Sequence, residues 1–307
     1  MSVKKAYEAS EVRLRFSVEE RVRQKFEDIR IGVAILRNCS SESEGESESK
    51  SENKSGGVGG VTAEKAGKGI EREEIERERR EVEEEIRRTY DLHTLKDVPL
   101  LRIQRDFFWR MSVDPTKVRP ASEALIRRIL AGSGLPSISP VVDACNIASV
   151  KTLITFSAFD LERLSKESGV LHLKVRFASE GEEVTLIGNR KRRLTGRELV
   201  LTDAEKVLCV YVHGDVEATK VREDTKNVLL VAYGIPKLHT NYLEQGLAVA
   251  SEYIRRFAGG EEALRMILYA TAAAQQTAKS GKRKKKLRAE NPSAVACVDA
   301  FSAGEDA

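Results

Sequence analysis

VLHLKVRFA (residues 170–178) alternates two sets of side chains, apolar Leu171, Leu173, Val175 and Phe177 against polar His172, Lys174 and Arg176. A period of two is typical of a strand with one buried face, so this stretch predicts a half-buried β-strand. Apolar runs of strand length follow at intervals of roughly ten residues, and another precedes them. They are IGVAILRN (31–38), EVTLIG (183–188), RELVLTD (197–203), KVLCVYVHG (206–214) and NVLLVAYG (227–234). This spacing predicts an antiparallel sheet or a barrel.

Helical periodicity marks the segments around these strands. Residues 71–90 place Ile75, Val82, Ile86 and Tyr90 on one narrow stripe among many charges, which predicts a long, mostly solvated helix. Further helices are predicted after Pro99, at 115–134, around 242–257 and at 261–279, the last with Leu264, Ile267 and Leu268 inward. The sequence therefore predicts an α+β fold, with an antiparallel sheet or barrel core flanked by helices.

Composition limits the classes of partner. The 52 basic and 48 acidic residues leave a net charge of +4, so an anionic partner must be met by a local patch. No run of 18 apolar residues and no apolar N-terminal segment occur, which predicts a cytoplasmic protein without a membrane partner. The four cysteines are far apart and form no CxxC pair, so we expect neither a metal nor a disulfide framework, and no cofactor.

Low-complexity segments divide the chain. Residues 39–66 are rich in Ser, Glu and Gly and predict a disordered insertion. Residues 1–38 are expected to contribute a strand and a helix to the core domain, and residues 67–278 to form its main part. Residues 279–307 are expected to be a basic flexible tail.

An opening segment and three further blocks of different chemistry follow one another after residue 140. VVDA (141–144), Asn146 and AFDLERL (158–164) come first, and LKVRFASEGEEVTLIG, GRELVLTDAEKVLCV and EDTKNVLLV follow. Together they resemble the editing region, the B3/B4 domain, of the phenylalanyl-tRNA synthetase beta subunit. In that family the domain hydrolyses the ester that joins a wrong amino acid to tRNA. The resemblance implies the B3/B4 fold and trans-editing of aminoacylated tRNA, with no DNA partner.

Two positions depart from the family pattern. Ser157 stands where the family has a His before the AFD triplet, and Val231 stands where it has a pocket Glu. The tyrosine-selecting pocket of the family is therefore not expected to be preserved.

Ester hydrolysis needs a positioned water, donors for the developing oxyanion and groups that hold the substrate. Asp143, Asn146 and Ser149 recur at a spacing of three, which brings them toward one side of a turn and helix. We predict that they bind substrate. The alternative is that Asp143 or Asn146 caps a short helix that begins near Ile147.

A second cluster lies in VHGDVEATKVREDTKN (212–227). Asp215, Thr219 and Lys220 are predicted to be catalytic, because a carboxylate can orient water and the other two can donate to an oxyanion. His213 and Gly214 are predicted to bind substrate, as a possible general base and a close backbone approach. Ordinary turn and surface roles are the alternatives. Gly188, which aligns with an Asp-Gly turn in the family pattern, is also predicted to bind substrate, with a simple tight turn as the alternative.

The basic run KRKKKLR (282–288) carries six cations among seven residues. Lys282, Arg283, Lys284, Lys285, Lys286 and Arg288 are predicted to contact RNA phosphates, with solubility or targeting as alternatives. A non-catalytic tRNA-binding protein and an interaction scaffold built on residues 39–90 remain as alternatives to an aminoacyl-tRNA deacylase. The sequence does not indicate an oligomeric state.

Overall fold

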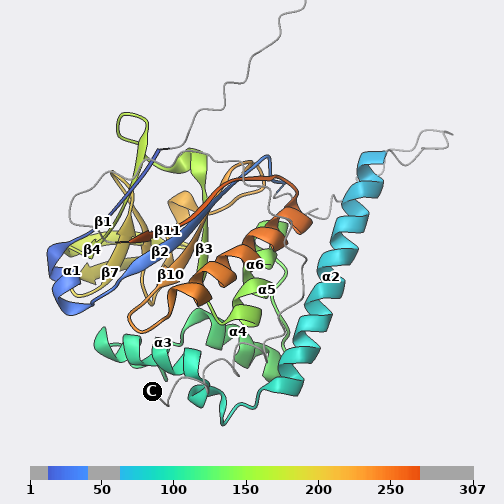
Figure 1. Cartoon of the computed structure of the whole chain (residues 1–307), viewed down its shortest axis with the longest axis horizontal. Coiled ribbons are helices and arrows are strands. Elements are labelled where there is room, and N and C mark those ends of the chain that lie inside the picture. Colours follow the sequence, from blue (N-terminus) through green and yellow to red (C-terminus); the bar gives the residue numbers. More distant parts are fainter. Residues whose placement is uncertain (1–12, 41–62, 270–307) are drawn as a thin grey trace, which may run out of the picture.

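The computed structural model describes residues 13–40 and 63–269. Within these ranges the chain forms an α+β fold in which two sheets are joined by one hydrophobic core, with helices on one side (Figure 1). The strands are β1 (Arg13–Val18), β2 (Arg30–Arg37), β3 (Phe156–Asp160), β4 (Val170–Phe177), β5 (Glu180–Leu186), β6 (Arg190–Thr195), β7 (Leu199–Thr202), β8 (Val207–Val210), β9 (Gly214–Asp215), β10 (Val228–Gly234) and β11 (Glu261–Tyr269).

The helices divide into a short one between β1 and β2 and a longer group that follows. The α-helices are α1 (Glu20–Lys25), α2 (Ala63–Thr89), α3 (Pro99–Arg110), α4 (Ala121–Leu130), α5 (Pro140–Thr152) and α6 (Thr240–Ala258). Single 3-10 turns are η1 (Leu95–Asp97), η2 (Leu161–Arg163) and η3 (Glu217–Thr219).

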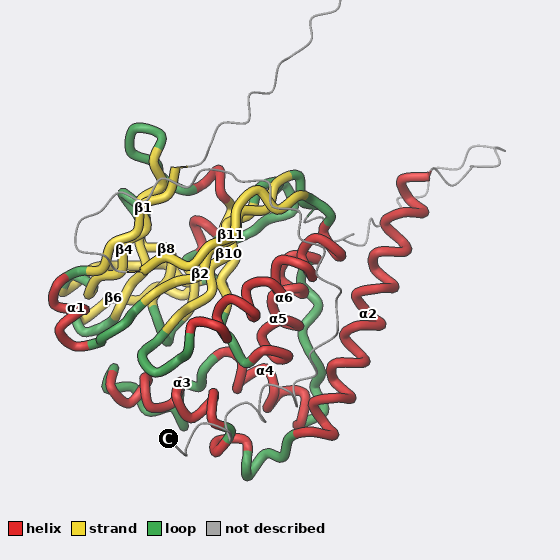
Figure 2. Tube along the Cα trace, in the orientation of Figure 1, coloured by secondary structure: helices red, strands yellow, loops and turns green. Residues whose placement is uncertain are grey.

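The strands form open sheets rather than a closed barrel (Figure 2). One sheet has the order β1-β4-β7-β8-β9, in which β1 and β4 run parallel and the other neighbours are antiparallel. The second has the order β11-β2-β10-β3 and is antiparallel throughout. β5 and β6 form a separate hairpin.

The centre of the second sheet is the most buried part of the molecule. Every residue of β10 is buried, and so is nearly every residue of β2. α6 packs on both strands, α5 packs on α6, and α2 lies against α4, α5 and α6 (Figure 1). Continuous apolar runs suit strands that are covered on both faces, which is why β2 and β10 lack the alternation of β4.

The α+β class and the antiparallel core are confirmed, and each strand predicted from an apolar run is present. The helix predicted at 71–90 begins earlier, at Ala63, and keeps Ile75, Val82 and Ile86 buried. The alternative that Asp143 or Asn146 caps a helix beginning near Ile147 is wrong, because α5 begins at Pro140 and Ser139 is its N-cap. Residues 41–62 of the predicted insertion and the tail at 279–307 lie outside the described residues.

The helix predicted at 261–279 is wrong over its described part, where β11 is a strand paired with β2. α6 ends at Ala258, and Gly259 and Gly260 follow with positive φ angles. A Cβ at Gly260 would come within 2.5 Å of the Arg37 carbonyl oxygen, so the chain must turn tightly against the end of β2. The open edge of β2 then supplies hydrogen-bond partners that outweigh helix propensity.

A buried ion pair fastens α2 to α5. Arg79 Nη2 lies 2.8 Å from Asp143 Oδ2, and their side chains are only 9% and 5% exposed. The second oxygen of Asp143 accepts the backbone N–H of Ile138 at 2.9 Å. Asp143 therefore holds the start of α5 and the flank of α2 together.

We expect Asp143→Ala to lower the free energy of unfolding by about 3 kcal/mol, because it leaves a buried guanidinium without this partner. Arg87→Ala, which removes the more exposed pair with Glu83, is the matched control and should cost less than about 1 kcal/mol. Chemical denaturation of the two variants measures the difference. Equal small losses would contradict a supporting role for Asp143.

Candidate active site

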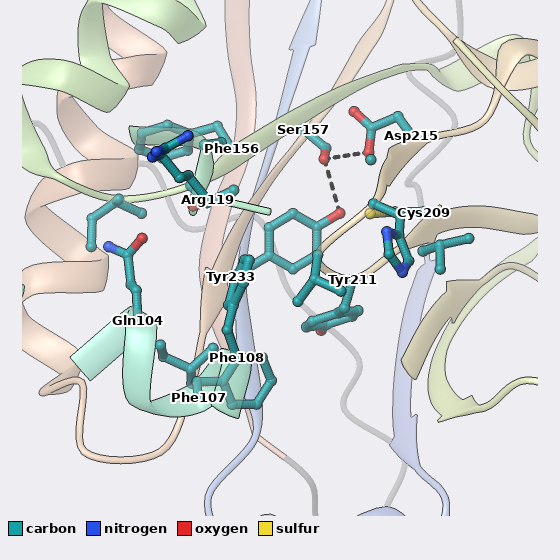
Figure 3. Close-up of a pocket in the computed structure, with 18 of the residues that line it drawn as sticks. Gln104, Phe107, Phe108, Arg119, Phe156, Ser157, Cys209, Tyr211, Asp215 and Tyr233 are labelled. Atoms are coloured by element: carbon teal, nitrogen blue, oxygen red, sulfur yellow. Dashed lines mark hydrogen bonds between the residues drawn. The ribbon is translucent and has the colours of Figure 1, made fainter. Parts of the chain in front are cut away.

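A cavity of about 300 Å³ lies at one end of the sheets, where α3 closes the space between the start of β3, the end of β10 and the β8–β9 turn. Its lining is mainly apolar and aromatic, with Phe107, Phe108, Phe156, Tyr211 and Tyr233 (Figure 3). This volume is at the small end for ligand sites, so it suits a ligand the size of an amino acid.

A chain of hydrogen bonds crosses the polar side of the cavity (Figure 3). The Tyr233 hydroxyl donates to Ser157 Oγ at 2.9 Å, and Ser157 Oγ donates to Asp215 Oδ1 at 2.6 Å. The Cys209 thiol is also hydrogen-bonded to the Asp215 carboxylate. Each donor orients the next group, so the chain delivers its hydrogen bonds to one buried carboxylate.

Desolvation by burial raises the pKa of the Asp215 carboxyl to about 6 from its usual value of 3.8, although hydrogen bonds from Ser157 and Cys209 oppose the shift. The residue still keeps partial solvent contact, and it lines the cavity. A carboxylate with this pKa is a stronger base than an ordinary one and is still mostly ionised at neutral pH. Asp215 can therefore accept a proton from a bound molecule.

The tight turn between β8 and β9 positions this wall. Val212 has a φ of 62°, which is costly for a β-branched residue, and Gly214 has a φ of 113°, which only glycine adopts easily. The turn brings Tyr211 and Asp215, on either side of it, into the lining of one cavity. The strained backbone at Val212 thus lies in the turn that shapes this side of the cavity.

Two further polar groups face the cavity without being committed elsewhere. The Tyr211 hydroxyl is buried and has no hydrogen-bond partner among residues 13–40 and 63–269. The exposed Arg119 side chain lies on the far side of the Tyr233 ring from Asp215 in the view of Figure 3. Gln104, by contrast, is bound to the Leu153 carbonyl and to Ser122. A bound molecule can therefore use Tyr211 and Arg119.

His213 lines the same cavity and contacts the β5–β6 hairpin. Its Nε2 lies 2.9 Å from Arg192 Nη2. Burial, followed by the nearby Arg192 charge, lowers the pKa of His213. The imidazole is therefore neutral at neutral pH.

The second predicted cluster is divided by the structure. Asp215, His213 and Gly214 line the cavity. Thr219 is fully buried in η3, and Lys220 pairs with Glu217; neither lines the cavity. The Gly188 N–H, at the tip of the β5–β6 hairpin, donates to Glu217 at 3.1 Å.

The first predicted cluster lies on α5, away from the cavity lining. Asp143 is held by Arg79, and Ser149 Oγ donates to the Ile154 carbonyl at 2.8 Å. Asn146 is half-buried on the same helix. The predicted RNA-contacting run at 282–288 lies outside the described residues.

Sequence reasoning did not assign Ser157, Cys209, Tyr211 or Tyr233 to the site. Ser157 could have been found from the sequence, because it stands where the family pattern has a His. That departure indicated only the loss of the family's pocket. The other three lie inside apolar strand-like runs, where nothing in the local pattern distinguishes a cavity side chain from a core side chain.

In the part of the chain that the structure describes, no three His, Cys, Asp or Glu side chains gather as a metal site would require. None of the helices described there has the length and hydropathy to cross a bilayer.

Comparison with known proteins gives three findings. The B3/4 domain family model matches residues 103–279. The phenylalanine–tRNA ligase beta subunit of Yersinia pestis is 38% identical over 113 residues, which is 37% of this chain and 14% of that subunit. The same subunit of Thermotoga maritima is 33% identical over 133 residues, or 43% and 16% of the two chains. The chain thus matches only a small part of those subunits.

A solved structure is also similar. An N-terminal fragment of the phenylalanyl-tRNA synthetase beta subunit from Pyrococcus horikoshii aligns with 85% of this chain and 56% of that chain. The alignment has 12% sequence identity and a TM-score of 0.39.

The raised pKa of Asp215 makes stability depend on pH. Because the folded pKa exceeds the unfolded one, the protonated carboxyl stabilises the fold below pH 3.8, and this contribution is lost as the pH rises through about 6. A shift of this size corresponds to about 3 kcal/mol. The free energy of unfolding of the parent should therefore fall between pH 4 and pH 7, and in Asp215→Asn most of this fall should be absent. Parallel curves for parent and variant would contradict the assignment.

Proposed function

The chain belongs to the B3/4 domain family, and on that basis together with its cavity we propose that it hydrolyses the ester of mischarged aminoacyl-tRNA. The aminoacyl group would occupy the cavity, and the reaction would take place in trans, on tRNA already charged by a synthetase. The relatives that this chain matches are named as phenylalanine–tRNA ligase beta subunits, which supports tRNA as the partner.

The observation that carries the proposal is a single, partly buried carboxylate of raised pKa in an apolar cavity of amino-acid size. Esters are hydrolysed when a base removes a proton from the attacking water and donors stabilise the oxyanion. Asp215 meets the first requirement. For the second, the cavity offers the Tyr211 hydroxyl, which has no hydrogen-bond partner within the described ranges.

In the proposed reaction, Asp215 takes a proton from water as the water oxygen attacks the ester carbonyl carbon. The tetrahedral intermediate then collapses, the bond to the ribose oxygen breaks, and the proton passes to that oxygen. Free amino acid and tRNA with an intact ribose hydroxyl are the products. Ser157 and Tyr233 act by holding the carboxylate in one orientation.

We assign a supporting role to the remaining predicted residues. Thr219 and Lys220 hold the loop that follows β9, since one is buried in η3 and the other pairs with Glu217. Asp143 and Ser149 fix the ends of α5 in the same way. His213 and Gly214 shape the wall beside Asp215.

A non-catalytic tRNA-binding protein is the second candidate. It is favoured by Ser157 and Val231, which replace the His and Glu of the family pattern. Val231 is fully buried opposite Ser157 in the β3–β10 ladder and is absent from the cavity lining. This candidate predicts salt-dependent tRNA binding without turnover.

We expect the purified protein to release amino acid from at least one class in a panel of mischarged tRNAs. Asp215→Asn should slow that release by about 100-fold or more, because it removes the general base. The rate should also increase with pH through about 6, as Asp215 loses its proton. Loss of the radiolabelled ester over time, corrected for spontaneous hydrolysis, is the measurement.

Glu217→Gln is the matched control, since Glu217 is a nearby carboxylate outside the cavity lining. It should retain nearly the parent rate. A panel with no turnover, alongside clear tRNA binding, would favour the second candidate. Equal losses in the two variants would exclude Asp215 as the base.

A further inference from the structure

The β5–β6 hairpin carries four consecutive cations, Arg190, Lys191, Arg192 and Arg193. Pairing with β5 sorts them onto two faces. Arg190 and Arg192 lie opposite Leu186 and Val184, whereas Lys191 and Arg193 lie opposite Thr185 and Glu183. Directly paired residues share a face in an antiparallel ladder. The hairpin therefore has an inner and an outer pair of cations.

The inner face is turned toward the cavity. Val184 and Leu186 are buried in a small cluster with Val210 and Val216 from either side of the β8–β9 turn. The backbone N–H of Ile187 donates to the Asp215 carbonyl at 3.0 Å, which ties the hairpin to the strand that carries the proposed base. On the inner pair, Arg192 contacts His213, and both arginine charges lower the pKa of that imidazole.

The four cations are not neutralised by acidic partners within the described ranges. No salt bridge there includes any of them, and the polar contacts of the inner pair are to His213 and to the Ile187 carbonyl. Their charge is therefore available to an external anion.

A second cavity of about 320 Å³ lies next to the first, and Val212 and His213 line both. Arg192, Arg197 and Lys117 line it, and Arg119 lines the adjoining cavity. Two carboxylates, Asp114 and Glu198, also line the second cavity, so cations outnumber anions by three to two, and local hydrogen bonds hold both carboxylates in place. Asp114 accepts two hydrogen bonds from Thr116, and Glu198 accepts three from Thr195 and Arg197. We call this passage, from Arg119 past His213 to Arg192, the basic groove; Arg190 lies beside it, on the same face of the hairpin as Arg192.

We propose that the basic groove binds the phosphates of the single-stranded 3′ end of tRNA. This inference rests on the proposed function, because it places the terminal ribose where its aminoacyl group enters the first cavity. Separate cations spread along a groove match a chain with one charge per nucleotide better than they match one compact anion. Arginine also presents a planar fork of donors to phosphate oxygens.

The test compares two double variants of the full chain that differ only in the face they change. Arg190→Ala with Arg192→Ala removes the inner pair, and Lys191→Ala with Arg193→Ala removes the outer pair. Each loses two charges from the same strand, and each retains every other basic segment. Fluorescence anisotropy measures binding of a labelled single-stranded RNA that ends in CCA and of uncharged tRNA, over a range of salt concentrations.

The inner variant should bind both RNAs about 10-fold more weakly at low salt, and its slope of log K against log salt should fall by about 1.4, from two lost phosphate contacts. The outer variant should stay close to the parent. Equal effects of the two variants, or no effect of either, would overturn the proposal. The proposal would also be overturned if the parent bound a blunt RNA duplex as tightly as the CCA-ended strand and the inner variant lost affinity for both equally.

Thermal unfolding of each variant separates lost binding from lost fold, and Arg119→Ala, which leaves the hairpin unchanged, should weaken binding in the same direction. Because these RNAs carry no ester, the outcome does not depend on hydrolysis. A protein that binds through the inner pair but releases no amino acid would support the groove and refute the deacylase. If both double variants hydrolysed the ester at the same rate, the deacylase would be supported and the groove refuted.

Discussion

The ladder that β10 forms with β2 on one side and β3 on the other organises the molecule. Its side chains are buried on both faces, so their backbone groups must be paired within the sheet. Residues far apart in the sequence are brought together by that requirement. The same ladder places Tyr233 beside Ser157, and thereby sets the hydrogen bonds that reach Asp215.

Burial has a different consequence at each of the two acidic groups that matter most. Asp143 is enclosed together with the Arg79 guanidinium, and the ion pair holds α2 and α5 together. Burial still raises the pKa of the Asp143 carboxyl, although the Ile138 N–H and the Arg79 charge oppose the shift. Asp215 is enclosed with hydroxyl and thiol donors but without a cation, so its charged form remains costly. The pKa is raised at both carboxyl groups, but only Asp215 lines the cavity, where a bound molecule can reach it.

Prediction from the sequence succeeded where the spacing of apolar residues fits only a strand or only a helix. Alternation identifies β4, and helix signals identify α4 between Pro120 and Gly132. It failed at β11, because Leu264, Ile267 and Leu268 have helical spacing whereas Leu264, Met266 and Leu268 have the alternation of a strand. The choice between the two depends on the open edge of a distant strand. Asp215 could be singled out as a polar residue near a glycine turn. Tyr233 could not, since only the pairing of β10 with β3 brings it to Ser157, and Tyr211 could not, since it lies in an apolar run that resembles core.

The order of strands in the second sheet also bears on how the chain is made. β2 lies near the N-terminal end but is flanked by β10 and β11, both more than half the chain away. While the ribosome is still translating the intervening residues, this apolar strand has neither neighbour available. Long-range pairing of this kind is slow and leaves strand edges open to intermolecular association. The newly made chain therefore depends on protection of β2 until its last strands emerge.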